Sequence, residues 1–264
     1  MKDRMDELAK ETLARYMPGT AIHVRPVTES TNTWAKEAAA AGAPEVAVFV
    51  AERQTGGRGR RGRSFFSPSG GLYMSIVVHP SLPPDAAVRI TTAAAVAVCR
   101  AAADVFGVEC GIKWVNDVFH GGRKVCGILT EASTADGRLD WAVVGIGVNV
   151  TAPADGFPPE ISDIAGALTD TPAPDGRARL AAAIWREFFA LYQSLPTGAY
   201  MDEYRRRCFV IGRDVTVVLA DGTKTPATAE EIDGECRLVV RYADGTRSAL
   251  ASGEISIKMQ KDSQ

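Results

Sequence analysis

The residues best suited to chemistry lie in a run of arginines and glycines. Residues 53–63 read RQTGGRGRRGR, with five arginines, four glycines and no acidic residue. Arginine presents a planar fork of donors that suits phosphate and carboxylate, and glycine lets backbone N–H groups approach an anion closely. We therefore expect a mobile loop that binds a polyphosphate. A solvated basic loop and a weak RNA-binding patch are the alternatives.

The loop matches neither of the standard phosphate-binding motifs. Residues 57–62 fit the G-x-G-x-x-G pattern, but the sequence SFFSP of residues 64–68 follows where a helix should begin. The chain also contains no G-x-x-x-x-G-K-[ST] sequence. Its net charge of −2 makes the positive charge of the loop a local feature. A dinucleotide site, a P-loop and a general nucleic-acid coat are therefore not expected.

Three small polar residues, Ser30, Thr31 and Asn32, stand just before a helical run at residues 33–41. The first N–H groups of a helix lack helical partners, so these side chains could simply cap it. Together with those N–H groups they could instead form a polar receptor for a small ligand.

One lysine and two glycines stand out in predicted strands. Lys113 lies between Ile112 and Trp114, so its ammonium points to the opposite face of the strand. A solvent-facing or ion-paired lysine is the ordinary interpretation. Gly145 and Gly147 lie in one strand, where missing side chains let a flat ligand approach the backbone. A bulge or tight packing is the alternative.

The remaining pattern predicts the elements that hold these residues in place. Short apolar runs bounded by turn residues predict strands, and amphipathic or alanine-rich runs predict helices. We expect helices at residues 3–16, 33–41, 85–106, 177–195 and 200–207, and strands at residues 22–27, 46–51, 72–78, 124–131 and 141–150. Residues 111–117 are expected to form a strand that runs into a turn. From residue 209 the pattern changes to short strands with turns, which predicts a separate small β-barrel and a boundary near Cys208.

Composition restricts the class of protein. With 264 residues and 46% apolar residues, the chain can form one full domain and a small one. The five cysteines include no C-x-x-C pair, and the three histidines include no H-E-x-x-H motif, which argues against zinc and favours reduced thiols in a cytoplasm. Residues 1–16 are charged rather than apolar, and no apolar run looks long enough to span a bilayer. We expect a cytoplasmic protein that does not bind membranes.

Taken in order, the motifs resemble biotin protein ligase over about residues 20–258. The matching segments are STN at 30–32, ERQTGGRGRRGR at 52–63, FSP at 66–68, KWVND at 113–117, KVCGILTE at 124–131, GIGVN at 145–149 and GEIS at 253–256. The resemblance implies an α+β protein. Residues 1–207 would form a catalytic domain related to class II aminoacyl-tRNA synthetases, with a mixed sheet and packed helices, and residues 208–264 an SH3-like barrel.

The resemblance also implies a reaction in two steps. Biotin and MgATP would give biotinyl-5′-AMP and pyrophosphate, and a lysine of a biotin carboxyl carrier domain of a carboxylase would then take the biotinyl group. An arginine or lysine at the reacting phosphate would act where negative charge develops. A loop that orders around the ligand would exclude water from the activated mixed anhydride.

Residue roles follow from the same resemblance. Lys113 and Arg58 are the implied catalytic residues. The implied positions for biotin, adenylate and phosphates are Ser30, Thr31, Asn32, Gln54, Gly57, Arg58, Arg60, Arg61, Arg63, Lys113, Gly145, Gly147 and Asn149. The metal ligands stay unassigned. Asp117 and Lys258 are further possible polar contributors to the site. Val115 departs from the family, which usually has proline there, and is expected to affect the turn rather than the reaction.

Other functions make different predictions. Only 29 residues precede Ser30, too few for a helix-turn-helix domain with a linker, so DNA binding is not expected. A lipoate or octanoate ligase is the nearest enzymatic alternative, but an alkyl chain would leave the polar residues 30–32 unpaired. An RNA-binding protein would show steeply salt-dependent affinity and no dependence on Lys113. A homodimer stays open.

Overall fold

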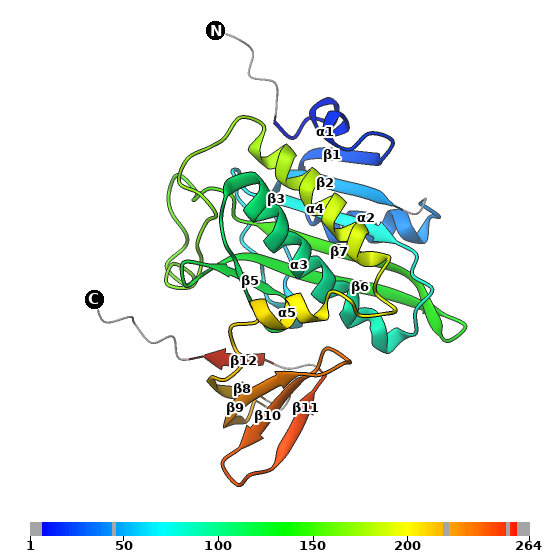
Figure 1. Cartoon of the computed structure of the whole chain (residues 1–264). Helices are drawn as coiled ribbons and strands as arrows, with labels where there is room; N and C mark the ends of the chain where they lie inside the picture. Colours follow the sequence, from blue (N-terminus) through cyan, green and yellow to red (C-terminus); the bar gives the residue numbers. More distant parts are fainter. Residues whose placement is uncertain (1–6, 44–45, 219–221, 252–253, 258–264) are drawn as a thin grey trace.

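The larger unit is a seven-stranded mixed sheet, described here from a computed structural model (Figure 1). The structure describes residues 7–43, 46–218, 222–251 and 254–257. The strands are β1 (Ala21–Thr28), β2 (Ala47–Gln54), β3 (Leu72–Val78), β4 (Gly111–Lys113), β5 (Asp117–His120), β6 (Arg123–Ala135) and β7 (Arg138–Val148). Their order across the sheet is β1-β2-β3-β7-β6-β5-β4. β1 and β2 are parallel and the other neighbours are antiparallel, so the predicted mixed sheet is confirmed.

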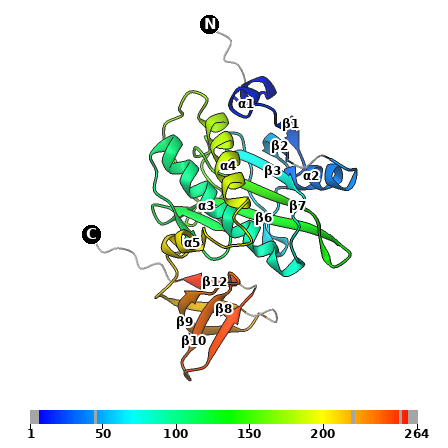
Figure 2. The ribbon, with the colours of Figure 1, turned by 45° about the vertical axis from the view of Figure 1, so that its right-hand side comes forward.

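Helices cover both faces of this sheet. They are α1 (Lys10–Tyr16), α2 (Thr31–Ala40), α3 (Ala87–Phe106), α4 (Gly176–Tyr192) and α5 (Met201–Arg207), with short 3-10 turns η1 (Arg60–Gly62) and η2 (Pro84–Ala86). α3 and α4 lie side by side over one face, as Figure 1 and Figure 2 both show. α2 packs against β2, β3 and β7.

The strands alternate between two apolar cores, one on each face of the sheet. On β2, Val48 joins the larger core with α3 and α4, whereas Phe49 joins a smaller core beneath α2. Val143 of β7 also belongs to the smaller core. Because side chains alternate along a strand, Gly145 and Gly147 continue the same face as Val143. The missing side chains let Asn32 of α2 and the ring of Phe65 lie close to the backbone of β7 on this face.

Two expected elements differ from the structure. The helix expected from residue 3 begins at Lys10 among the described residues, because Ala9 has an extended backbone; residues 1–6 lie outside the described part. The strand and turn expected at residues 111–117 are present, but the turn is tight and β5 begins already at Asp117, which pairs with Lys113 of β4. Trp114 and Val115 form this turn and are buried, and the Tyr204 hydroxyl donates to the Val115 carbonyl at 3.1 Å. Because the turn residues are apolar, the sequence did not show where β4 ends.

One helix contradicts the expectation that no apolar run is long enough to cross a membrane. Pro84–Phe106 meets that criterion by length and composition, but 67% of its apolar window is buried inside the protein. Its alanines and valines pack against α4 and the sheet. The apolar composition is therefore explained by its place in the larger core.

The second unit is a five-stranded antiparallel sheet, the SH3-like unit that the sequence predicted. Its strands, in the order β11-β10-β9-β8-β12, are β8 (Asp214–Val218), β9 (Lys224–Ile232), β10 (Leu238–Tyr242), β11 (Arg247–Leu250) and β12 (Glu254–Ile257). The predicted boundary near Cys208 falls in the connection between α5 and β8. The two units touch where the Trp114 indole donates to the Cys236 carbonyl at 2.9 Å.

All five cysteines are buried thiols. Burial raises the pKa of each of them, to about 12 for Cys110 and for Cys208. Thiols of this kind are mostly protonated at neutral pH and react slowly.

Candidate active site

Two rows of residues cross the sheet on the face that carries α2. The strand register places side by side, from β3 to β4, Tyr73, Gly147, Gly127, Asp117 and Lys113. The neighbouring row contains Ser75, Gly145 and Leu129. The glycines form a floor of bare backbone, with a serine hydroxyl at one end and the Lys113 ammonium at the other.

A polar pocket lies at the serine end of this floor. It is lined by several of the residues singled out in the sequence, namely Ser30, Thr31, Asn32, Gln54, Arg58, Gly145 and Gly147. Ser30 is the N-cap of α2, yet its side chain makes no capping hydrogen bond and is 2% exposed. Side-chain capping therefore does not explain Ser30, which lines the pocket.

Hydrogen bonds between residues distant in sequence order the polar pocket. The side-chain oxygen Gln54 Oε1 accepts from the Thr31 backbone N–H at 2.8 Å, and the side-chain nitrogen Gln54 Nε2 donates to Ser67 Oγ at 2.9 Å. The Ser75 hydroxyl donates to Asn32 Oδ1 at 2.7 Å and lies 2.8 Å from Thr31 Oγ1. These polar groups are thus already oriented without a ligand.

The ring of Phe65 covers the glycine floor. A Cβ atom on Gly147 would lie 2.6 Å from Phe65 Cε1, and one on Gly127 would lie 3.0 Å from Phe65 Cε2. The polar pocket beneath keeps a volume of only about 20 Å³, which suffices for about one water molecule. A larger ligand must displace Phe65, and the glycines give the ring and the ligand room to approach the backbone.

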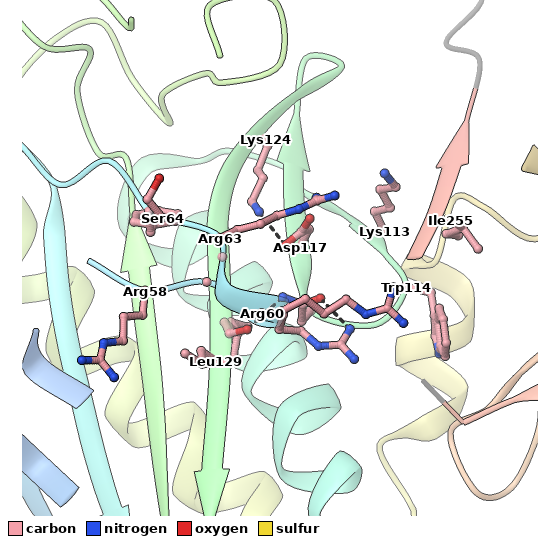
Figure 3. A pocket seen from close by; sticks show the side chains of 16 residues that line it. Arg58, Arg60, Arg63, Ser64, Lys113, Trp114, Asp117, Lys124, Leu129 and Ile255 are labelled. Carbon is pink, nitrogen blue, oxygen red and sulfur yellow. Dashed lines mark hydrogen bonds and ion pairs between the residues drawn. The ribbon is translucent and has the colours of Figure 1, made fainter. Parts of the chain in front are cut away.

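A basic cavity of about 130 Å³ lies beside the polar pocket (Figure 3). Among the described residues that line it, six are cationic: Arg58, Arg60, Arg61, Arg63, Lys113 and Lys124. Asp117 is the acidic one. The two spaces share Arg58, Phe65, Gly127 and Leu129 as lining residues, so they are neighbouring parts of one site.

Arg60 is the least exposed arginine of the loop. Its guanidinium donates to Asn116 Oδ1 at 3.3 Å. Desolvation by burial and the neighbouring charge of Arg61 lower the pKa of Arg60, as expected for a cation held partly out of water beside another cation. Arg58 instead forms an exposed ion pair with Glu29 at 3.1 Å, and Figure 3 shows its side chain pointing away from Lys113.

The structure adds residues to which sequence reasoning gave no role. Lys124 lines the basic cavity and forms an ion pair with Asp117 at 2.7 Å, and the two face each other in Figure 3. Asn116 and Phe65 also line the cavity. The alternation of β6 could have indicated Lys124, but the loop conformation that carries Phe65 depends on packing across the sheet.

Two positions implied by the resemblance, Gly57 and Asn149, do not line either space. A Cβ on Gly57 would collide with the Phe65 carbonyl and the Ser67 hydroxyl, so the glycine permits close packing within the loop. Asn149 is buried, and its amide donates to the Gly166 carbonyl at 3.0 Å, which ties the end of β7 to the segment that follows. Lys258 lies outside the described residues.

The sequence assigned no metal ligands, so we looked at which side chains of the site could hold a metal ion. Within the described ranges, no group of three or more His, Cys, Asp or Glu side chains could hold a metal ion. Magnesium is usually held by one or two carboxylates together with the phosphates of the substrate. Asp117 in the basic cavity fits that role for a nucleotide-bound magnesium.

Comparisons with known protein families agree with this geometry. Residues 24–149 match the model of the biotin/lipoate A/B protein ligase family, and residues 210–258 match the biotin protein ligase C-terminal domain. A biotin--[acetyl-CoA-carboxylase] ligase of Mycobacterium tuberculosis is 33% identical over 238 residues, covering 86% of this chain and 85% of that protein. The chain belongs to the biotin/lipoate A/B protein ligase family.

A second relative and a solved structure are also similar to this chain. A bifunctional ligase/repressor BirA of Bacillus spizizenii is 39% identical over 152 residues, covering 57% of this chain and 47% of that protein. The match thus spans about half the length of the Bacillus relative. A biotin protein ligase from Aquifex aeolicus, solved with biotin and ATP, has a TM-score of 0.75 at 23% identity over 91% of this chain and 99% of that one. The structural similarity establishes the fold.

Proposed function

We propose that this protein is a biotin protein ligase. It would join biotin and ATP to form biotinyl-5′-AMP and pyrophosphate, and then transfer the biotinyl group to a lysine of a biotin carboxyl carrier domain. One observation carries the proposal: a hydrogen-bonding pocket and a cavity lined by six cations share one glycine floor. A ligand with a polar ring at one end and a carboxylate near a polyphosphate matches both parts.

The first step needs positive charge where two anions meet. A carboxylate oxygen of biotin attacks the α-phosphorus of ATP, the bond to the bridging oxygen breaks, and pyrophosphate leaves. Negative charge increases on the phosphorus oxygens, so fixed cations at that point stabilise the transition state. Lys113 at the end of β4 and Arg60 in the loop are held at the cavity and suit this role.

The second step needs protection from water. The lysine amine of the acceptor attacks the acyl carbon, AMP leaves, and the new amide nitrogen loses a proton. Before the acceptor arrives, water would hydrolyse the mixed anhydride. Phe65 and the arginine loop cover the floor in this structure, and closing again over the adenylate would exclude water.

Magnesium would enter with ATP. It would neutralise part of the phosphate charge, and Asp117 is the carboxylate in the basic cavity that could hold it. The five buried cysteine thiols suit a reducing cytoplasm, which we propose as the location. The absence of DNA binding stays a prediction, which a gel-shift measurement would test. A homodimer stays open, and light scattering would test it.

The first test is pyrophosphate exchange. Purified protein with biotin, Mg²⁺ and ATP should incorporate labelled pyrophosphate into ATP, and adding a biotin carrier domain should label one lysine. Exchange with lipoate or octanoate and none with biotin would overturn the substrate assignment. No exchange with any of these acids would overturn the ligase activity.

A further inference from the structure

An ion pair lies directly behind the polar pocket. The Lys36 ammonium of α2 lies 2.5 Å from Glu131 Oε1 of β6. The other oxygen, Glu131 Oε2, accepts a hydrogen bond from the Asn32 amide at 3.0 Å. Glu131 is thus held from one side and itself holds a residue that lines the pocket.

The Asn32 amide has a single favoured orientation. Its nitrogen donates to the Leu129 carbonyl at 3.1 Å and to Glu131, which uses both of its hydrogens. Its oxygen accepts from Ser75. In the flipped orientation, the amide oxygen would face a carboxylate and a carbonyl, and both would repel it.

The charge of Glu131 strengthens this preference. Although desolvation raises the pKa of Glu131, hydrogen bonds from Lys36 and Asn32 lower it, and the pKa lies below its ordinary value. The carboxylate therefore stays charged at neutral pH and acts as an acceptor only. A hydrogen bond to a charged acceptor is stronger than one to a neutral group.

We infer that Glu131, held by Lys36, is a positioning residue that keeps Asn32 Oδ1 facing the pocket and so selects a ligand that presents N–H groups there. This inference rests on the proposed function, because the ureido ring of biotin supplies such N–H groups. A fatty acid or a dithiolane acid has none and would leave the Asn32 oxygen without its second partner.

Isosteric substitution separates positioning from simple ion pairing. In Glu131→Gln, the Lys36 ammonium should donate a hydrogen bond to the new side-chain oxygen. The new NH₂ group then points toward the NH₂ group of Asn32. Two donors then face each other, and biotin affinity should fall about tenfold, as expected for the loss of a charged hydrogen bond. Adding Lys36→Met frees the glutamine amide to present its oxygen to Asn32, so the double variant should recover most of the affinity.

Calorimetry with biotin, together with steady-state kinetics, measures these effects. The inference expects a raised KM for biotin, an unchanged KM for ATP and an unchanged kcat in Glu131→Gln. Glu37→Gln, an exposed position next to Lys36, is the matched control and should bind biotin as wild type does. If Glu131→Gln does not fold by circular dichroism, Glu131→Asp, which withdraws the carboxylate from Asn32, replaces it and should lose affinity similarly.

The outcomes are distinct from those that test the ligase activity. If wild-type protein does not bind biotin, the proposed function fails. If wild type binds biotin and Glu131→Gln binds equally well, the inference fails alone. It also fails if the double variant binds as weakly as Glu131→Gln, because releasing the glutamine amide from Lys36 would then not restore the orientation of Asn32.

Discussion

The two parts of the site are built in opposite ways. In the polar pocket, Thr31, Asn32 and Gln54 already have hydrogen-bond partners within the protein, so their orientation precedes the ligand. In the basic cavity, cations outnumber carboxylates, and the charge is gathered on a loop with one 3-10 turn, η1. The first part is suited to recognition and the second to stabilising charge that arrives with the nucleotide.

Because the two parts differ in this way, mutations in them should have different effects. Damage to the polar pocket should weaken biotin binding, because preorganised hydrogen bonds discriminate between ligands. Damage to the basic cavity should slow chemistry, because its charges act mainly in the transition state.

The largest effect is expected for Lys113→Ala. Loss of one group that stabilises transition-state charge costs about 3 kcal/mol, so adenylation should slow about 100-fold or more. Biotin affinity without ATP should change much less. Pyrophosphate exchange and calorimetry measure the two quantities, with Lys224→Ala, on the exposed start of β9, as the control. A rate close to that of wild type would remove Lys113 from the chemistry.

Gly145→Ala should damage the polar pocket instead. Its Cβ would collide with the Asn32 amide, and overpacking costs about 1–3 kcal/mol. Biotin affinity should therefore fall about 10- to 100-fold. Gly234→Ala is the control, because nothing lies within 4 Å of a Cβ at that position. Equal biotin affinity in both variants would mean that the Asn32 position is not needed for binding.

Phe65→Ala links the two parts. Removing the ring uncovers the glycine floor, so biotin should associate several-fold faster in stopped-flow measurements, because no ring has to move. The adenylate should also be lost to water several-fold faster in single-turnover assays without an acceptor, because the cover is gone. Slower association would show that Phe65 serves only to hold the ligand.

Salt should give the smallest effect and still distinguish the parts. Raising potassium chloride from about 0.05 to about 0.5 M shortens the screening length and should raise the KM for ATP a few-fold. The affinity for biotin alone should change little, because its polar ring meets neutral hydrogen-bonding groups. An equal salt dependence for both ligands would contradict the division of roles.

Local patterns predicted much of this molecule. Alternation placed Lys113 on the face opposite Ile112, which holds in the structure. At the glycines of β7 the structure shows close packing by Asn32 and Phe65, and the flat ligand expected there stays a prediction. The order of motifs indicated the family and both structural units. These features depend on neighbours within a few residues, which is what a sequence pattern records.

Non-local contacts explain the rest. The Lys36–Glu131 pair joins residues 95 positions apart in the sequence. The Phe65 ring contacts Gly127 of β6 and Gly147 of β7, which are also far from it in the sequence. The hairpin turn at Trp114 and Val115 is stabilised by Tyr204 of α5 and by the second unit. No periodicity in the chain encodes such pairings, because they arise only when the sheet register and the loop path are both fixed.

The buried cysteines have a practical consequence. Since all five thiols are inside the protein with raised pKa values, maleimide reagents should leave the native protein largely unmodified. A single cysteine introduced at the exposed Arg61 could then be labelled with a fluorophore in an otherwise silent background. Its emission would report directly whether the arginine loop closes when nucleotide is added.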